Sequence, residues 1–348
     1  MEMLSPKDEL LQVLEGEDIG YFPRAIPLFS PVVDMMKRTG VYFPAGNYEA
    51  EPMAKLALAA HEQGTWNSVM LPWPSTVESE AMGCEVVCKD NDIAGYPQVK
   101  GRAFEDAYDV ELCDDILLKG SFPAVFGAIR IVRETIDKRY AGVIPVVALS
   151  QGPFTIAGNV IGVSDMFKHV IKDVKRAQRT LEVVSDLNIQ YINEMLECGG
   201  DVVLLADPSA QGLTAEQFKR LLVPFYQKIS QAVPAKIMFH VCGRTSKLAK
   251  HLPETGFEGF SFDFPSTSIE DLRKAFGHKV RLIGSVPTLT HLLEGKREDV
   301  IEITLQLIRK GVDILSPSCG LPQYSPLENI RAMSEGIMIY NKEKGVAF

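Results

Sequence analysis

Asp201-Val-Val-Leu-Leu-Ala206 and Lys236-Ile-Met-Phe-His240 are two short apolar runs joined by a stretch with helical periodicity. Both runs are nearly continuous in apolar residues, which is typical of parallel strands buried on both faces. Between them, Thr214-Ala-Glu-Gln217 has the spacing of a capping box and predicts the start of a helix. This order predicts two parallel strands joined by a crossover helix, and therefore an α/β fold.

Similar runs occur along the whole chain, each followed by polar residues, Pro or Gly. Together they predict eight strands, at Ala25 to Phe29, Ser68 to Leu71, Ile144 to Leu149, Asp201 to Ala206, Lys236 to His240, Gly259 to Phe262, Val280 to Ile283 and Val312 to Leu315. Helical patterns lie between these strands. One of them, Thr180 to Cys198, keeps one face apolar and is followed by Gly199-Gly200, which predicts a helix end.

Two further helices are predicted near the end of the chain. A helix through Ile301, Leu305 and Ile308 is expected to end at Lys310-Gly311. Ser325-Pro326-Leu-Glu328 combines a capping signal with Pro at the first helical position, so a helix is expected to begin there with Ser325 as its cap.

The alternation of eight strands with helices predicts a (β/α)8 TIM barrel. The length of 348 residues is sufficient, because this fold typically needs roughly 250. We expect one domain over residues 1–348, with an N-terminal helical extension over 1–24 and an insertion after the second predicted strand over 72–143. No low-complexity linker divides the chain. An open doubly wound sheet is the main alternative, but no G-x-G-x-x-G motif opens a helix after a strand, which weakens its dinucleotide-binding version.

The composition restricts the class of partner. The chain has 36 Lys and Arg against 45 Asp and Glu, a net charge of −9, which argues against nucleic acid as a partner. The start carries no secretory signal pattern, and no apolar run is long enough to span a membrane. Six cysteines are too sparse for a disulfide scaffold, and we therefore expect a protein of the reducing cytoplasm.

Polar residues follow the predicted strands, where a barrel places its active site. His240 and Cys242 are two positions apart at the end of one strand, so both side chains point to the same side if the strand continues. Cys319 follows the last strand, and a closed sheet would bring it near them. These three residue types suit zinc, whose catalytic sites use three protein ligands and an open position. The alternative is a satisfied core histidine with two small buried cysteines.

Two acidic residues also follow strands. Asp207 and Asp263 are candidates for a catalytic role as proton acceptor, for a fourth metal ligand or for a hydrogen-bond partner of His240. An aspartate after a strand often caps the next helix instead, and that interpretation remains open for both residues.

These motifs resemble a known family. The resemblance covers essentially the whole chain and rests on Leu71-Pro-Trp-Pro-Ser-Thr-Val-Glu78, Gln151-Gly-Pro-Phe-Thr155, Phe239-His-Val-Cys-Gly243, Gly259-Phe-Ser-Phe-Asp263, Ile283-Gly-Ser285, Pro317-Ser-Cys-Gly-Leu321 and Pro326-Leu-Glu-Asn-Ile330. The family is the uroporphyrinogen decarboxylase superfamily, and within it the zinc-dependent methylcobamide:coenzyme M methyltransferases. The H-x-C motif with a distant Cys is the most specific part, because the decarboxylase branch lacks that zinc site.

Two departures from the decarboxylases favour the methyltransferase branch. In the decarboxylases an Asp after the second strand holds the pyrrole nitrogens of the substrate, whereas this sequence has Leu71-Pro-Trp-Pro74 there. Their arginine-rich opening, which pairs the carboxylates of the substrate, is reduced here to Arg24. A metal-independent lyase of the decarboxylase type remains the alternative function, and a barrel that only binds a corrinoid or its carrier protein is a third hypothesis.

The resemblance implies a mechanism and partners. Zinc held by His240, Cys242 and Cys319 would bind the thiolate of coenzyme M, which takes a methyl group from a methylated corrinoid (methylcobamide) and gives methyl-coenzyme M in methanogenesis. Ser150, Gln151 and Arg24 are candidates to bind the sulfonate of coenzyme M. The corrinoid is expected on a separate protein, because no D-x-H-x-x-G cobalt-binding segment occurs here. Part of the 72–143 insertion is expected to form its docking surface.

Overall fold

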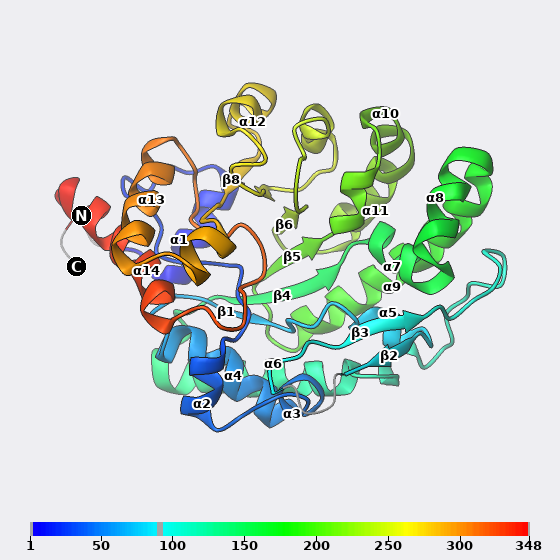
Figure 1. Ribbon diagram of the computed structural model, residues 1–348, viewed down its shortest axis with the longest axis horizontal. Coiled ribbons are helices and arrows are strands. Elements are labelled where there is room, and N and C mark those ends of the chain that lie inside the picture. Colours follow the sequence, from blue (N-terminus) through cyan, green and yellow to red (C-terminus); the bar gives the residue numbers. More distant parts are fainter. Residues whose placement is uncertain (1–2, 89–92, 347–348) are drawn as a thin grey trace.

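The computed structural model describes residues 3–88 and 93–346, and within them six strands form one parallel sheet. In sheet order the strands are β1 (Val69–Leu71), β4 (Val146–Gln151), β5 (Val202–Ala206), β6 (Ile237–His240), β7 (Gly259–Ser261) and β8 (Arg281–Ile283). Each confirms one predicted strand, and each neighbouring pair is parallel. The strands run through the middle of the molecule with the helices outside them (Figure 1).

The other two predicted strands are not regular strands, which corrects the prediction. Residues 312–315 are held to β8 by an isolated bridge between Ile283 and Ile314. Asp313 and Ile314 both donate their N–H to Leu282 O, so the ladder is irregular there. In Ala25–Phe29, Pro27 has no N–H to donate, and the contact with the strand region of β1 is a hydrogen bond from Ser68 Oγ to Ile26 O.

Contacts between these two extended segments and their continuations bring the edges of the sheet together. Leu321 N donates to Ser30 Oγ at 2.8 Å, and Val33 N donates to Gln323 O at 2.7 Å. Ser30 follows the segment beside β1, and Leu321 follows the segment beside β8. The arrangement is the predicted (β/α)8 barrel, with irregular extended chain at two of its eight strand positions.

Helices surround the sheet and join its strands. They are α1 (Pro6–Glu15), α2 (Val33–Thr39), α3 (Ala45–Tyr48), α4 (Ala50–Glu62), α5 (Val77–Ala81), α6 (Phe122–Tyr140), α7 (Pro153–Ile161), α8 (Val163–Lys172), α9 (Val174–Glu197), α10 (Ala215–Gln217), α11 (Val223–Ala232), α12 (Ile269–Phe276), α13 (Arg297–Arg309) and α14 (Leu327–Glu343). Short 3₁₀ or π turns are η1 (Ile116–Leu118), η2 (Pro208–Gly212), η3 (Phe218–Leu222), η4 (Ala249–Glu254) and η5 (Thr288–Leu293).

Three predicted helix signals are confirmed. The helix predicted from Thr180 is α9, which begins earlier, at Val174, because Asp173 caps it. The capping box at Thr214 is present with both of its hydrogen bonds. The helix α13 ends at Arg309, one residue before the predicted Lys310-Gly311 stop.

The predicted cap of the last helix is wrong. Pro326, not Ser325, occupies the N-cap position of α14, and the Ser325 hydroxyl is buried without a hydrogen-bond partner among the described residues. The free N–H of Leu327 donates instead to Asp34 Oδ2 at 3.3 Å. A carboxylate that is distant in the sequence therefore replaces the local cap.

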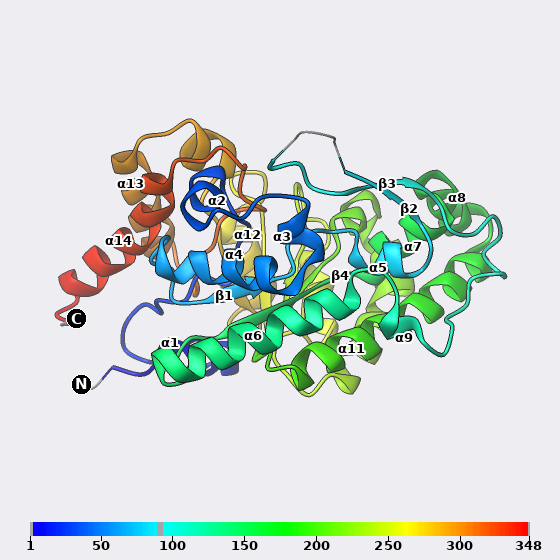
Figure 2. The same ribbon diagram turned by 90° about the horizontal axis from the view of Figure 1, so that it is seen from below.

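The predicted insertion over residues 72–143 contains several elements. Its first part holds α5, the antiparallel pair β2 (Glu85–Val87) and β3 (Gln98–Gly101), and η1. Its second part is the long helix α6, which packs lengthwise against α4 and joins this region to β4 (Figure 2). The part of the predicted insertion that departs from the alternation of barrel strands and helices is therefore the chain between β1 and α6. None of the described helices has both the length and the apolar character needed to cross a membrane.

Candidate metal centre

His240, Cys242 and Cys319 meet at one point. His240 is the last residue of β6, and Cys242 follows it by two positions, whereas Cys319 comes from the chain that follows the bridge beside β8. His240 Nε2 lies 3.2 Å from Cys242 Sγ, and Cys242 Sγ lies 3.3 Å from Cys319 Sγ. All three ligand atoms lie within 4.8 Å of one another. The barrel therefore brings together the three residues that the sequence pattern singled out.

A serine on the next strand orients the histidine. His240 is in register with Ser261 of β7, and His240 Nδ1 is hydrogen-bonded to the buried Ser261 Oγ at 2.9 Å. This bond directs Nε2 toward the two sulfurs, as a second partner does for histidines that bind metals. Ser261 was not among the predicted site residues, although it lies within the predicted strand Gly259 to Phe262.

A hydrogen bond between the two thiols shifts their pKa values in opposite directions. Hydrogen bonds from Cys242 and from His240 hold the pKa of Cys319 below its usual range. The neighbouring Cys319 sulfur and burial raise the pKa of Cys242. The site thus stabilises a thiolate at Cys319, which is the form of cysteine that binds a metal.

The geometry fits a tetrahedral zinc ion. Bond lengths of about 2.0–2.1 Å to nitrogen and 2.3 Å to sulfur place neighbouring ligands of such an ion roughly 3.5–3.8 Å apart. The separations of 3.2 and 3.3 Å need only a small expansion to reach those values. Among the described residues, this is the one group of three or more His, Cys, Asp and Glu side chains close enough to hold an ion.

Asp263 lies beside the group but is not part of it. Its Oδ2 accepts a hydrogen bond from Gly243 N at 3.3 Å, and its carboxylate also accepts one from Ser318. Burial raises the pKa of Asp263. Because Gly243 follows Cys242 and Ser318 precedes Cys319, the carboxylate ties together the two segments that carry the cysteines.

Asp207 is occupied elsewhere. Its carboxylate accepts hydrogen bonds from Phe154 N, from Thr155 N and Oγ1, and from Tyr226 Oη, at distances between 2.6 and 3.0 Å. The N–H groups belong to the first turn of α7, so Asp207 caps that helix from the neighbouring strand end. Asp207 is therefore a helix cap, as the alternative interpretation holds, but the helix that it caps, α7, precedes β5 in the chain and is not the next helix. Each carboxylate oxygen already accepts two hydrogen bonds, which leaves neither oxygen free for a metal.

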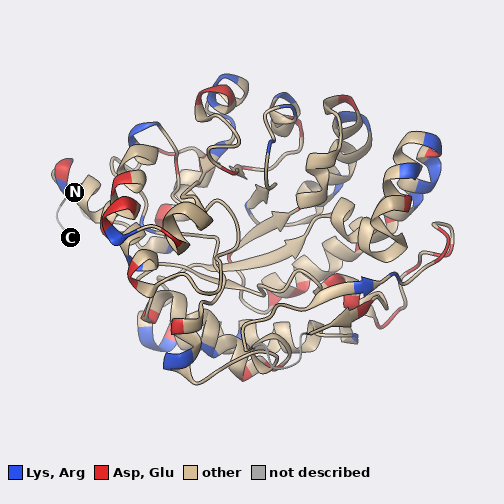
Figure 3. Cartoon of the chain, viewed as in Figure 1, with Lys and Arg blue, Asp and Glu red and all other residues tan. Residues whose placement is uncertain are grey.

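A cavity of about 860 Å³ opens beside the three ligands. His240, Cys242 and Cys319 line it, together with Gln151 and Trp73, among other apolar and neutral polar residues. Among the residues in 3–88 and 93–346 that line it, none is Asp, Glu, Lys or Arg. Charged residues gather instead on the surrounding helices, and β1, β4 and β5 carry none (Figure 3).

Comparisons with known proteins identify the family of the chain. The model of the family described as "Uroporphyrinogen decarboxylase (URO-D)" matches residues 5–338. The chain belongs to the uroporphyrinogen decarboxylase family. The resemblance drawn from the sequence motifs is thereby confirmed at the level of the family.

Individual relatives identify the branch of this family. The chain is 31% identical over 336 residues to the methylcobamide:CoM methyltransferase MtaA of Methanosarcina barkeri, which covers 96% of this chain and 97% of the relative. It is 29% identical to a methylated-thiol–coenzyme M methyltransferase of Methanosarcina mazei, over 94% of this chain and 88% of the relative. A solved structure of a methyltransferase from Methanosarcina mazei has a TM-score of 0.92 at 30% identity and covers 97% of this chain and 99% of that one. The predicted likeness to the methyltransferase branch is confirmed.

Ser150 and Gln151, two of the predicted substrate residues, have different surroundings in the structure. Ser150 and Gln151 end β4, and both are buried. Ser150 Oγ donates to Glu78 Oε1 at 2.8 Å and accepts from Asn188, so its hydroxyl faces the interior. Gln151 lines the cavity.

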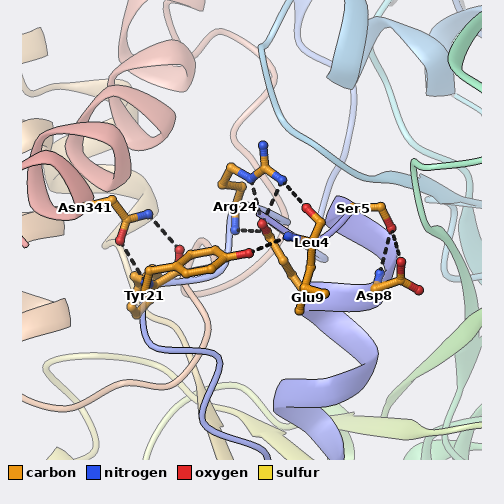
Figure 4. Close-up of polar contacts among 8 residues, drawn as sticks. Leu4, Ser5, Asp8, Glu9, Tyr21, Arg24 and Asn341 are labelled. Atoms are coloured by element: carbon orange, nitrogen blue, oxygen red, sulfur yellow. Dashed lines mark hydrogen bonds and ion pairs between the residues drawn. The ribbon is translucent and has the colours of Figure 1, made fainter. Parts of the chain in front are cut away.

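Arg24 does not reach the site. Its guanidinium pairs with the fully buried Glu9 and donates to Leu4 O, and its main-chain N–H also donates to Glu9 (Figure 4). It borders a separate small cavity with Thr65 and Asn67. Arg24 therefore fastens the N-terminal extension, and its position gives no support to the predicted sulfonate binding.

Glu78 is a buried acid that the sequence analysis did not single out. Burial raises its pKa from 4.5 to about 7, although hydrogen bonds from Gln151 N and Ser150 lower it in part. Because the pKa is raised in the folded protein, the stability contributed by its proton is complete below pH 4.5 and is lost as the pH rises through 7.

We therefore expect Glu78→Gln to remove this pH dependence. Relative to wild type, the free energy of unfolding of the variant should rise by about 3 kcal/mol between pH 4.5 and pH 8. Urea unfolding at a series of pH values measures the difference, and Asp207 stays in both proteins as an internal control. A difference that does not change with pH would show that Glu78 is not protonated in the folded protein.

Proposed function

We propose that this protein is a zinc-dependent methyltransferase that moves a methyl group from a methylated corrinoid, carried by a separate protein, to the thiol of coenzyme M. The observation that carries the proposal is the His240, Cys242 and Cys319 group on the wall of a large cavity whose described lining residues carry no Asp, Glu, Lys or Arg. The similarity to methylcobamide:CoM methyltransferases over almost the whole chain supports the reaction type.

His240, Cys242 and Cys319 would hold the zinc ion and leave a fourth position open to the cavity. When bound, zinc supplies a positive charge that favours the thiolate form of a thiol at neutral pH. Cys242 and Cys319 as thiolates would balance the charge of a divalent ion. The cavity beside them would receive the thiol and the methyl donor, and the described residues that line it are apolar or neutral polar.

The remaining candidates have supporting roles in this proposal. Asp263 positions the two cysteine segments through Gly243 and Ser318, and Asp207 holds α7 in place. Tyr96 and Gln98, in and beside the β2–β3 excursion, also line the cavity. This placement supports the expectation that part of the insertion borders the docking surface for the corrinoid protein.

The structure does not favour the alternative, a metal-independent lyase acting on a porphyrinogen. Such a substrate carries several carboxylates and needs cationic partners, whereas the part of the chain that the structure describes contributes no Lys or Arg to the cavity lining. The six cysteines, all free, agree with the cytoplasmic location that the proposal assumes.

The direct test is methyl transfer by the purified, zinc-loaded protein. With methylcobalamin and coenzyme M, we expect methyl-coenzyme M to form and the reaction to stop when a chelator removes the zinc. Porphyrin formation in the presence of chelator, or no methyl-coenzyme M from protein that holds one zinc per chain, contradicts the proposal.

Removal of the histidine's partner gives a finer test. Ser261→Ala is expected to weaken zinc binding by roughly 10- to 100-fold, because the imidazole loses the bond that directs Nε2 to the sulfurs. Competition with a fluorescent chelator measures the affinity. Ser68→Ala removes another buried hydroxyl in the barrel and serves as the control. Equal affinities in the two variants would show that Ser261 does not orient the ligand.

A further inference from the structure

Cys242 and Cys319 are two thiols in direct contact. Their Sγ atoms lie 3.3 Å apart, although the residues are 77 positions apart in the sequence. The other cysteines have partners of another kind: Cys84, Cys88, Cys198 and Cys113 are hydrogen-bonded to Asn159 O, Tyr48 Oη, Glu194 Oε1 and Asp115, respectively. Among the described residues, Cys242 and Cys319 are therefore the cysteine pair whose sulfurs meet.

The two sulfurs are close to bonding distance. A disulfide bond is about 2.0 Å long, so the sulfurs have to approach each other by roughly 1.3 Å. Neither residue lies within a helix or a strand, because Cys242 is two positions beyond the end of β6 and Cys319 follows the bridge between Val286 and Pro317. Displacements of about 1 Å are ordinary for atoms of a folded protein, so bond formation needs no change of fold.

A small molecule can reach both sulfurs. Cys242 and Cys319 line the cavity of about 860 Å³ and are half-buried, whereas Cys84 and Cys198 are buried away from it. The described residues of the cavity wall carry no charge. A small disulfide therefore meets no like charge on this wall, whatever the sign of its own charge.

We infer that Cys242 and Cys319 are a redox-sensitive pair, which a small disulfide converts into an intramolecular disulfide when no zinc is bound. The inference rests on the zinc ligands of the proposed function, but it does not depend on methyl transfer. It assigns a modification site and a form of regulation to the metal centre.

The reaction is a thiol–disulfide exchange in two steps. One cysteine sulfur, as a thiolate, attacks a sulfur of the small disulfide, so a mixed disulfide forms and one thiolate leaves. The other cysteine sulfur then attacks the cysteine sulfur of the mixed disulfide, so the bond between Cys242 and Cys319 forms and a second thiolate leaves. The two departing thiolates take up the two protons that the cysteines lose. The pair is oxidised by two electrons, and the small disulfide is reduced to two thiols.

Zinc and the disulfide exclude each other, because both need the same two sulfurs. The disulfide leaves His240 as the single ligand of the group, which is fewer than zinc sites in proteins use. Bound zinc in turn engages both sulfurs and withholds them from exchange. Oxidation of the surrounding thiols would therefore switch off metal loading, and their reduction would restore it.

Peptide mapping by mass spectrometry tests the inference on zinc-free protein treated with hydroxyethyl disulfide, a small uncharged disulfide. We expect a cross-link between the peptides of Cys242 and Cys319, and a mixed disulfide at the exposed Cys113. Protein loaded with one zinc per chain should form the cross-link at least about 10-fold more slowly. The cross-linked protein should bind zinc at least about 100-fold more weakly and regain its affinity after reduction.

Two variants and two buried cysteines serve as controls. Cys113→Ala removes the exposed thiol and should leave the cross-link and its zinc dependence unchanged, whereas Cys242→Ala should trap a mixed disulfide at Cys319. Cys84 and Cys198 should stay reduced, because the folded chain buries them.

Three results would overturn the inference: mixed disulfides on both members of the pair, a cross-link that forms as fast with zinc as without it, or reaction of Cys84 and Cys198 before the pair. Failure of the proposed function gives a different result. In that case the zinc-dependent cross-link forms as expected, but the reduced, zinc-loaded protein transfers no methyl group to coenzyme M.

Discussion

Exchange of Cys319 for alanine is expected to remove most of the bound zinc and to lower methyl transfer by at least about 100-fold. Cys319 is the one ligand supplied from outside the β6 segment, and its Sγ lies 3.3 Å from that of Cys242. Without it, His240 and Cys242 offer only two ligands, which is fewer than zinc sites in proteins use. Metal analysis of the purified variant and a single-turnover assay with methylcobalamin measure the two losses.

Cys84→Ala is the matched control. Cys84 is a free cysteine like Cys319, but it is buried, it lies outside the ligand group, and burial raises its pKa to about 11. Its exchange should leave zinc content and transfer near wild-type values. If Cys319→Ala keeps one zinc per chain and full transfer, the metal centre is not the site of reaction.

The strands could be predicted where local sequence decides them. Residues 146–149 and Val202–Ala206 are continuous apolar runs within neighbouring strands of the sheet, and such runs are typical of a buried parallel strand. The prediction failed in two places. In one, a proline removes a main-chain hydrogen-bond donor from a predicted strand, and in the other, the residue that caps a helix is distant in the sequence. Pro27 lies within one predicted strand. At the start of α14, the N–H of Leu327 donates to Asp34 rather than to Ser325.

The same distinction applies to the site. His240, Cys242 and Cys319 could be found because strand ends in a barrel converge on one face. Ser261 and Glu78 act through burial and register, which a single sequence does not display.

The predicted sulfonate-binding role of Arg24 disregarded its position in the barrel. It precedes the extended segment that begins at Ala25, so it stands at the amino end of that barrel position. A barrel places its active site at the carboxyl ends of the strands. Topology alone therefore argues against Arg24 as a substrate residue, and its pairing with Glu9 agrees with that argument.

The second large effect is expected on the free energy of unfolding and not on zinc binding. Asp207→Ala is expected to lower the free energy of unfolding by about 4 kcal/mol, because Phe154 N, Thr155 N and Oγ1, and Tyr226 Oη lose a buried acceptor together. Zinc content per folded chain should stay near wild type, because Asp207 contacts none of the three ligand side chains. Denaturant unfolding and metal analysis of the same preparation separate the two quantities.

Asp263→Ala provides the contrast, because its carboxylate bonds to the residues beside Cys242 and Cys319. We expect this variant to lose roughly 10-fold or more in zinc affinity with a smaller loss of stability. If Asp207→Ala abolishes transfer while folded and fully loaded with zinc, Asp207 takes part in the reaction. If it only unfolds more easily, the aspartate that follows β5 is a helix cap, and the acidic residue that matters for the metal centre is Asp263.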